Sequence, residues 1–285
     1  MTILIFSLIA SAITFYYEWK YPFSNGKYVA EYIDKNFDKD EVMIVGYADF
    51  TAETVSGYLN KDIYYPNSKN VKKLVDWHDR TENVTIDEIF SEADYFADKY
   101  GQVILVNMFE VQEAEIPFNY NLLEKFTDSI VNTENYYLYY FNKTEILNKS
   151  KLIQKFDYSN FSDFWIPVNQ CYFSIKNNNI YVKATGTDPY FESIFPIIFD
   201  KKDTLMMIVR INSPINSRFQ IFYKRYGQNY NEDDSQYFTL FSGMNNIYIN
   251  IPNPDDLENI RIDPVCTQAD TIIKSVEFYK LDNAK

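Results

Sequence analysis

The sequence predicts a two-domain α+β protein: an N-terminal membrane-type helix, a small α/β domain with a mostly parallel sheet, and an antiparallel β-sandwich of jelly-roll-like type. Three observations predict this order. Residues 1–20 are largely apolar, residues 21–146 alternate helical and strand-like patterns, and residues 147–285 contain short strands separated by polar turns. A length of 285 residues suits two domains of ordinary size.

The N-terminal run "MTILIFSLIASAITFYYEWK" has no charge between Thr2 and Tyr17. A helix of this run is about 24 Å long at ~1.5 Å per residue, which is slightly short of a bilayer core of roughly 30 Å. Trp19 and Lys20 close it as an interfacial belt would. We therefore interpret residues 1–20 as a membrane-spanning or anchor helix. A cleaved signal peptide and a core helix are the alternatives.

The α/β domain is predicted from alternating periodicities in residues 21–146. Val29, Ile33 and Phe37 recur at helical spacing, and "EVMIVG" is a short apolar run of the kind that forms a buried strand. Thr85 and Glu88 form a capping box at the start of a helix. The expected helices are residues 26–37, 50–59 and 86–100, and the expected strands are residues 41–46, 62–66, 102–107 and 135–141.

The β-sandwich is predicted from strands with period-two alternation and little helix. Phe219, Ile221 and Tyr223 recur with a period of two, and turns such as "NSPINS" and "SGMNN" separate the runs. Regular spacing of this kind is typical of an antiparallel sandwich. The expected strands are residues 179–184, 204–211, 218–225, 236–241, 246–251 and 271–281.

The composition excludes several classes of function. A net charge of −13 without a basic stripe argues against a nucleic-acid partner, because phosphate binding needs clustered Lys and Arg. His78 is the only histidine and cannot build the multi-histidine site that zinc prefers, so we expect no metal and no cofactor. The only cysteines are Cys171 and Cys266, and the sequence leaves open whether they form a bridge or two free thiols.

Candidate ligand residues lie in "GTDPYFES", in "IRIDP" and at the start of the sandwich domain. The first interpretation of these residues is a core or turn role. A carbohydrate-binding role is the second, because β-sandwich modules bind sugars when aromatic side chains stack on pyranose rings and polar side chains bind hydroxyls. The aromatic candidates are Trp165, Tyr190 and Phe191, and the polar candidates are Asp188, Arg261 and Asp263.

An alternative site lies in the α/β domain, because open α/β sheets bind ligands at the carboxyl ends of their strands. Asp49 follows the strand "EVMIVG", and Glu110 follows the strand "QVILVN". The glycine-rich phosphate fingerprint is missing, since Gly46 stands alone. The sequence contains no catalytic motif strong enough to name a reaction.

The two halves together resemble a known arrangement. "YVAEYIDKNFDKDEVMIVGYADFTAETVSGYLNKDIYYP" and "IVNTENYYLYYF" are similar to the soluble tail that follows the last transmembrane helix of bacterial multi-spanning glycosyltransferases of the lipid-phosphosugar-dependent, mannosyltransferase-like kind. "GTDPYF", "FQIFYK" and "IRIDP" resemble a β-sandwich that recurs beside bacterial surface-polysaccharide glycosyltransferases. The resemblance implies that residues 1–20 are the final span and that the remainder is extracytoplasmic. The catalytic acidic residue of these enzymes lies in an early loop that has no counterpart here, so no active-site residue is carried over.

We therefore expect a membrane-tethered, non-catalytic accessory or tail region that acts in bacterial envelope glycan assembly. Its expected partners are the membrane, a glycan or lipid-linked sugar, and a membrane glycosyltransferase. The orientation stays open, because Lys20, Lys27 and Lys35 follow the span and the positive-inside rule alone would place the domains in the cytoplasm. The alternatives are a sugar-processing enzyme that uses Asp49 and Glu110, and a purely structural interaction module.

Overall fold

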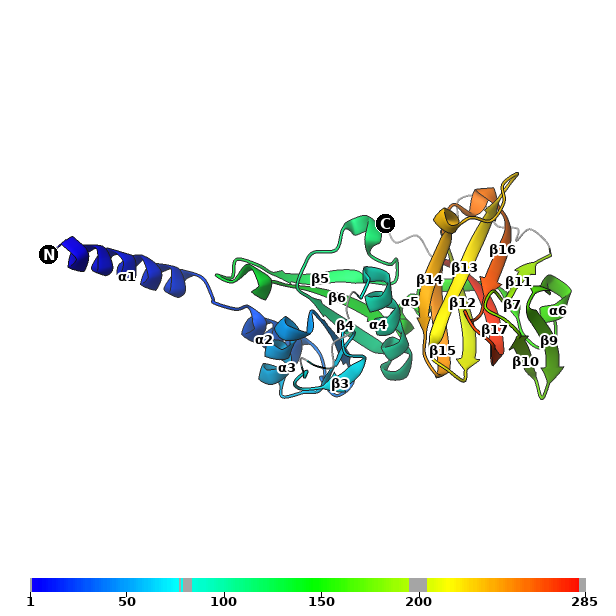
Figure 1. Cartoon of the computed structure of the whole chain (residues 1–285), viewed down its shortest axis with the longest axis horizontal. Coiled ribbons are helices and arrows are strands. Elements are labelled where there is room, and N and C mark those ends of the chain that lie inside the picture. The colour runs from blue at the N-terminus through cyan, green and yellow to red at the C-terminus, as the bar shows by residue number, and fades with distance from the viewer. Residues whose placement is uncertain (1, 77, 79–83, 195–203, 282–285) are drawn as a thin grey trace. The chain divides into compact units, whose positions relative to one another are not determined.

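The computed structural model describes residues 2–76, 78, 84–194 and 204–281, and the chain divides into two compact units (Figure 1). The first unit consists of Met1–Thr85 and Tyr100–Phe141, and the second of Ile86–Lys99 and Asn142–Lys285. The change of unit after Phe141 lies close to the expected boundary between residues 146 and 147. The helix expected over residues 86–100 forms as predicted but groups with the second unit.

The N-terminal residues form helix α1, as their apolar run predicts. In the part of the chain that the structure describes, no helix combines the length and the apolarity that a membrane crossing requires. The interpretation of residues 1–20 as a membrane span is therefore not supported. The helices are α1 (Thr2–Lys20), α2 (Gly26–Asn36), α3 (Asp49–Leu59), α4 (Ile86–Tyr100), α5 (Lys143–Asn148) and α6 (Phe161–Phe164).

The first unit contains one six-stranded sheet, sheet I, with strand order β3-β2-β1-β4-β6-β5. Strand β1 pairs in parallel with β2 and β4, whereas β2 with β3 and β5 with β6 are antiparallel. The sheet is therefore mixed, because the β2–β3 and β5–β6 connections are too short for a parallel crossover. Its strands are β1 (Met43–Tyr47), β2 (Ile63–Tyr65), β3 (Asn70–Lys72), β4 (Gln102–Asn107), β5 (Asn121–Phe126) and β6 (Tyr136–Asn142).

The core of the first unit forms where α2 and α3 cover sheet I. Val29 and Ile33 of α2 and Val55 of α3 are fully buried together with Ile44 of β1, as the helical and strand periodicities require. Gly46 permits the close packing of α3, since an added Cβ would lie 2.5 Å from the Cβ of Ala52. Gly46 is thus a packing residue of the β1–α3 turn.

The second unit is an antiparallel β-sandwich, which confirms the predicted sandwich. Sheet II has the order β15-β12-β17-β10-β9, with β7 also paired to β17, and sheet III has the order β14-β13-β16-β11-β8. All strand pairs in both sheets are antiparallel among the residues described. Sheet II contains β7 (Ser150–Phe156), β9 (Cys171–Lys176), β10 (Asn179–Ala184), β12 (Thr204–Ser213), β15 (Gly243–Ile251) and β17 (Ala269–Leu281). Sheet III contains β8 (Trp165–Asn169), β11 (Tyr190–Ser193), β13 (Ser217–Arg225), β14 (Ser235–Leu240) and β16 (Leu257–Asp263).

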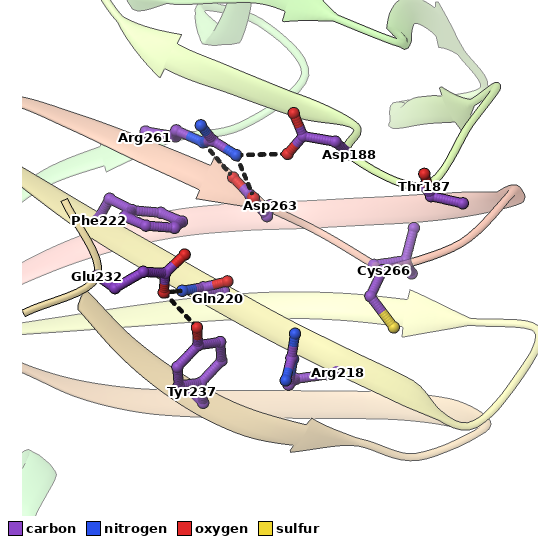
Figure 2. Close-up of a pocket in the computed structure, with 11 residues that line it drawn as sticks. Thr187, Asp188, Arg218, Gln220, Phe222, Glu232, Tyr237, Arg261, Asp263 and Cys266 are labelled. Atoms are coloured by element: carbon purple, nitrogen blue, oxygen red, sulfur yellow. Dashed lines mark hydrogen bonds and ion pairs between the residues drawn. The ribbon is translucent and has the colours of Figure 1, made fainter. Parts of the chain in front are cut away.

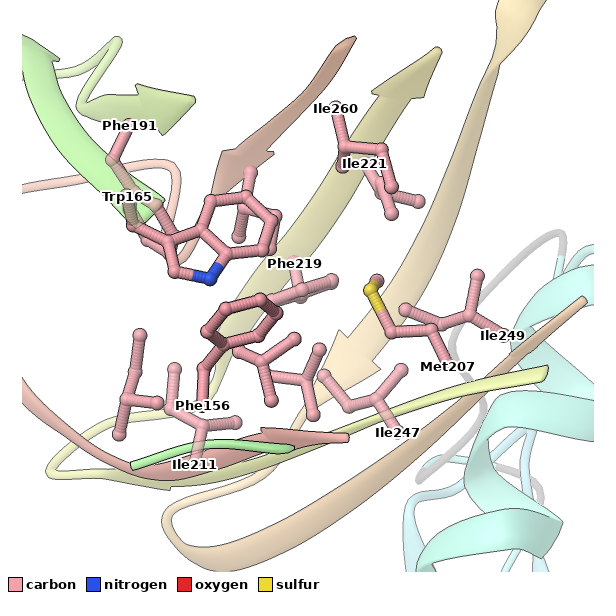
Figure 3. Close-up of a cluster of buried hydrophobic side chains, with 14 of the residues drawn as sticks. Phe156, Trp165, Phe191, Met207, Ile211, Phe219, Ile221, Ile247, Ile249 and Ile260 are labelled. Carbon is pink, nitrogen blue, oxygen red and sulfur yellow. The ribbon is translucent and has the colours of Figure 1, made fainter. Parts of the chain in front are cut away.

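The sandwich core lies between sheets II and III (Figure 3). Phe219 and Ile221 of β13 meet Met207 of β12 and Ile249 of β15, and all four side chains are fully buried. Each burial of this kind stabilises the fold by roughly 1.5–3 kcal/mol relative to an exposed side chain. Because side chains alternate along a strand, inward Phe219 and Ile221 leave their neighbours on the outer face of sheet III.

Helix α4 covers one open side of this sandwich. Ser91 Oγ accepts a hydrogen bond from the backbone N–H of Thr239 on β14 (2.7 Å), and Asp98 Oδ2 accepts one from the N–H of Asn246 on β15 (2.7 Å). Strands β14 and β15 are the edge strands of sheets III and II. The helix thus satisfies backbone donors on both edges, where unpaired strands would otherwise invite association.

Candidate functional site

The outer face of sheet III gathers polar and aromatic side chains from three neighbouring strands. On β13, Arg218, Gln220 and Phe222 alternate with the buried residues of the core. The strand register places Gln220 opposite Asp263 and Phe222 opposite Arg261 on β16. Residues directly opposite each other in an antiparallel pair are in contact distance, so the register builds one continuous site.

This face is hollowed by a cavity of about 190 Å³ (Figure 2). This volume is well above the roughly 10–15 Å³ that one water molecule needs, and it leaves room for a small polar group or a sugar ring. The cavity opens on one sheet face and is not enclosed by the core. It is lined by Thr187, Asp188, Arg218, Gln220, Phe222, Glu232, Tyr237, Arg261, Asp263, Val265 and Cys266.

Arg261 is the centre of one half of the site. Its Nε and Nη2 donate to the two carboxylate oxygens of Asp263 (2.7 and 2.6 Å), and Nη2 also donates to Asp188 Oδ1 (2.7 Å). The guanidinium lies 3.7 Å from the ring centroid of Tyr190 and 4.6 Å from that of Phe222. Paired donors and two aromatic contacts hold this arginine in one orientation.

Burial and ion pairing shift the pKa values of Asp263 and Arg261 in opposite directions. Burial raises the pKa of Asp263 above its ordinary value, although the hydrogen bond and the charge of Arg261 oppose this shift. Burial by itself would lower the pKa of Arg261, but the hydrogen bond and charge of Asp263 and the charge of Asp188 raise it overall. Arg261 therefore stays a cation whose charge is balanced within the site.

The other half of the site is ordered by Glu232, which belongs to a short 3-10 turn before β14. Gln220 Nε2 donates to Glu232 Oε2 (2.9 Å), and the Tyr237 hydroxyl donates to the same oxygen. The hydrogen bond from Tyr237 lowers the pKa of Glu232, and the same bond raises the pKa of Tyr237. The guanidinium of Arg218 lies 4.4 Å from the ring centroid of Tyr237.

Four of the six ligand candidates meet at this site. Asp188, Tyr190, Arg261 and Asp263 lie around the Arg261 guanidinium, although they come from separate stretches of the chain. Asn169 of β8 supports Asp188, because its Nδ2 donates to the backbone oxygen of Asp188 (2.7 Å). Asp188 lies in a bend before β11 and Asp263 ends β16, so the two Asp-Pro steps lie at strand ends and their aspartates belong to the site.

The other two candidates, Trp165 and Phe191, do not fit a ligand role. Both side chains have an exposed fraction of 0% and belong to the sandwich core (Figure 3). Phe191 directly follows Tyr190 in β11, and adjacent residues of a strand point to opposite faces, so only Tyr190 reaches the outer face. Trp165 stacks on Phe161 with ring centroids 6.0 Å apart. Their role is packing.

Sequence reasoning missed Arg218, Gln220, Glu232 and Tyr237. The signal for two of them was present, because Arg218 and Gln220 alternate with the core residues of a strand that the sequence predicts. That pattern does not predict which strands pair with β13. Glu232 gave no signal, since it lies in a polar turn.

The alternative candidates, Asp49 and Glu110, follow two strands that pair in parallel, with Tyr47 of β1 opposite Asn107 of β4. Asp49 is 2% exposed and accepts a hydrogen bond from the N–H of Phe50 (2.7 Å) at the start of α3. Glu110 is exposed and forms an ion pair with Lys125. Both residues follow their strands, as expected. The Asp49 carboxylate binds the N–H of Phe50, and the Glu110 carboxylate binds Lys125.

The cysteines are free thiols, so they are not joined. Cys171 is buried and donates to the backbone oxygen of Tyr190 (2.9 Å), whereas Cys266 is exposed at the cavity. Among the described residues, no three His, Cys, Asp or Glu side chains are grouped so as to hold a metal ion.

No family model matches the chain, and no curated protein matches it. Among solved structures, the xylan-binding domain of CBM 22 has a TM-score of 0.37 and 12% identity, covering 47% of this chain and 97% of that one. The CBM1 of BiXyn10A has a TM-score of 0.36 and 8% identity, covering 45% and 97%. The second N-terminal cellulose-binding domain of Cellulomonas fimi β-1,4-glucanase C has a TM-score of 0.38 and 10% identity, covering 47% and 95%. At these values we draw neither the ligand nor the function of this chain from them.

Proposed function

We propose that the second unit is a carbohydrate-binding module and that it binds a glycan on the outer face of sheet III. One observation carries this proposal: Arg261 is fixed between the carboxylates of Asp188 and Asp263 and the rings of Tyr190 and Phe222, beside an open cavity of about 190 Å³. Sugars present hydroxyl groups and apolar ring faces together. Sites that combine placed polar groups with aromatic rings match this chemistry.

The lining of the cavity also favours a hydroxyl-rich ligand over an apolar one. Gln220, Glu232 and Tyr237 form a hydrogen-bonded chain that supplies donors and acceptors in fixed positions. Preorganised groups of this kind reduce the entropy that binding costs. A nucleic-acid ligand is disfavoured by the net charge of −13.

The proposal is tested by titrating the full chain with a panel of neutral and acidic polysaccharides in affinity gels and by calorimetry. We expect at least one polysaccharide to bind, and we expect Tyr237→Ala to weaken that binding about tenfold. The matched control is Tyr172→Ala, because Tyr172 is an exposed tyrosine on β9 of sheet II. If no polysaccharide binds at millimolar sugar, or if both variants bind as the parent does, the proposal is wrong.

We further propose that this glycan binding serves bacterial envelope glycan assembly as an accessory to a membrane glycosyltransferase, on the extracytoplasmic side. Two sequence segments support this role and location, residues 28–66 and 130–141. Both resemble glycosyltransferase tails. Cross-linking in intact host cells, followed by mass spectrometry, tests it. Recovery of a glycosyltransferase is expected, and recovery of cytoplasmic proteins alone would contradict both the partner and the location.

A further inference from the structure

We propose that the glycan bound by this face carries carboxylate groups and that Arg218 binds one of them. The inference rests on the proposed function, because it names the class of glycan that the same site takes. The expected ligands are acidic sugars, such as uronic acids, because the guanidinium of Arg218 would recognise their carboxylate groups.

Arg218 differs from the other arginines that the structure describes. Three of them form ion pairs, whereas no carboxylate within the described part of the chain pairs with Arg218. Its recorded partner is the ring of Tyr237, at 4.4 Å from the centroid. The paired arginines are Arg210 with Glu277 (3.3 Å), Arg225 with Asp234 (2.8 Å), and Arg261 with Asp263 and Asp188 (2.6 and 2.7 Å).

Arg218 contacts an aromatic ring and has no ion pair among the described residues, although, after the hydrogen bond from Tyr237, its charge helps to lower the pKa of nearby Glu232. It lies over Tyr237, whose hydroxyl is bound to Glu232, and Glu232 is in turn bound by Gln220 (Figure 2). A guanidinium carries five N–H donors in a planar fork that matches a carboxylate. Stacking on an aromatic ring leaves the edge of that fork free for a ligand in the cavity.

The carboxylates of the cavity already have partners within the chain. Asp188 and Asp263 bind Arg261, and Glu232 accepts from Gln220 and Tyr237. Arg218 is therefore the arginine of the cavity that has no ion pair within the described residues, and a ligand carboxylate can pair with it. Two arginines and three carboxylates give the lining a formal charge of 2 − 3 = −1, and the whole chain carries −13. Binding of an acidic glycan would thus depend on local contact with Arg218, and not on bulk attraction.

The test uses the full chain and polygalacturonate, compared with the same polymer after methyl esterification, which removes the charge and keeps the sugar. We expect the acidic form to bind more tightly, and we expect Arg218→Gln to weaken its binding about tenfold or more, as loss of a charge-assisted hydrogen bond does. Arg218→Lys should restore part of the affinity. Binding of the ester should not change in either variant.

The matched control is Lys183→Gln, which removes one exposed positive charge from β10 of sheet II. Thermal melting of each variant checks the fold, and Arg218 is itself exposed, so its substitution should leave the core intact. Equal binding of acid and ester, with no effect of Arg218→Gln, overturns the inference and leaves the proposed function standing. Equally tight binding of dextran sulfate shows that charge alone is recognised and also overturns it. Absence of binding to every polysaccharide overturns both.

Discussion

Arg261 and Asp263 lie two positions apart on β16 and form a two-point ion pair on the outer face of sheet III, with contacts of 2.7 and 2.6 Å. Both side chains are mostly buried, at 16% and 12% exposed. Removal of one partner from such a pair leaves a desolvated charge without compensation. The pair therefore couples the stability of the sheet to the geometry of the site.

This coupling is measurable in a double-mutant cycle. Arg261→Ala alone should lower the free energy of unfolding by about 2–4 kcal/mol, because Asp263 stays behind unpaired. Arg261→Ala combined with Asp263→Ala should cost less than the sum of the single changes. Urea unfolding of the full chain, followed by tryptophan fluorescence, to which the buried Trp165 contributes, gives these values. Strict additivity would show that the two side chains do not interact in solution.

Acid should destabilise the second unit through Glu277 on β17. Burial opposes its ionisation, but hydrogen bonds from Tyr279 and Ser275 and the charge of Arg210 outweigh burial and lower its pKa to about 2 from 4.5. A depressed folded-state pKa adds stability above the unfolded value, and this stability is lost as pH falls from 4.5 towards 2. A shift of this size corresponds to roughly 3 kcal/mol.

Glu277→Gln should therefore flatten the dependence of the unfolding free energy on pH between about pH 5 and pH 2.5. Asp270→Asn on the same strand is the control, because Asp270 is exposed. Thermal melts at half-unit pH intervals supply the curves. An unchanged slope in Glu277→Gln would assign the acid sensitivity to other carboxylates.

The contact of α4 with the sandwich depends on Asp98. Its carboxylate accepts from the N–H of Asn246 (2.7 Å), from the hydroxyl of Tyr248 (3.2 Å) and from Lys143 Nζ (3.0 Å). Asp98→Ala should cost about 1–3 kcal/mol, because a buried donor loses its partner. Hydrogen exchange of β15 should accelerate, while that of the central strand β12 follows global unfolding only. Equal acceleration of both strands would argue against a local role for this contact.

The two thiols should react at different rates. Burial raises the pKa of Cys171 to about 11, so this thiol should react only after unfolding. Burial acts in the same direction on exposed Cys266, but hydrogen bonds from Ser217 and the backbone of Arg218 outweigh it and lower its pKa. Titration of the native chain with a thiol reagent should show one fast equivalent. Two fast equivalents, or none, would contradict this geometry.

Local patterns in the sequence predicted many of the helices and strands, but they gave no strand at β3, β5, β7, β8, β9, β11 or β16. The alternation of Phe219, Ile221 and Tyr223 correctly predicted strand β13 and its buried face, and Thr85 correctly marked the start of the helix that ends at Tyr100. These features depend on neighbours in the chain. Period and capping residues suffice to specify them.

Relations between distant elements could not be predicted. The pairing of Gln220 with Asp263 depends on which strands become neighbours, and Glu232 enters the site from a turn. The helical pattern likewise predicts that one face of α4 is buried, but it does not predict that this face packs on β14 and β15. The sequence left Trp165 and Phe191 open between a core and a ligand role for the same reason, since an aromatic residue in a strand belongs to the core or to the surface according to register.

Helix α4 lies in the chain between β3 and β4 of sheet I, yet it packs on the sandwich. The second unit is therefore discontinuous in sequence, and no single cut yields both folds whole. A fragment of residues 142–285 would keep the outer face of sheet III but expose the edges of β14 and β15, and it should self-associate through them. The sandwich is consequently not a cassette that gene fusion or recombination can move on its own. Its transfer to another protein would have to include residues 86–99, which the chain supplies from between two strands of sheet I.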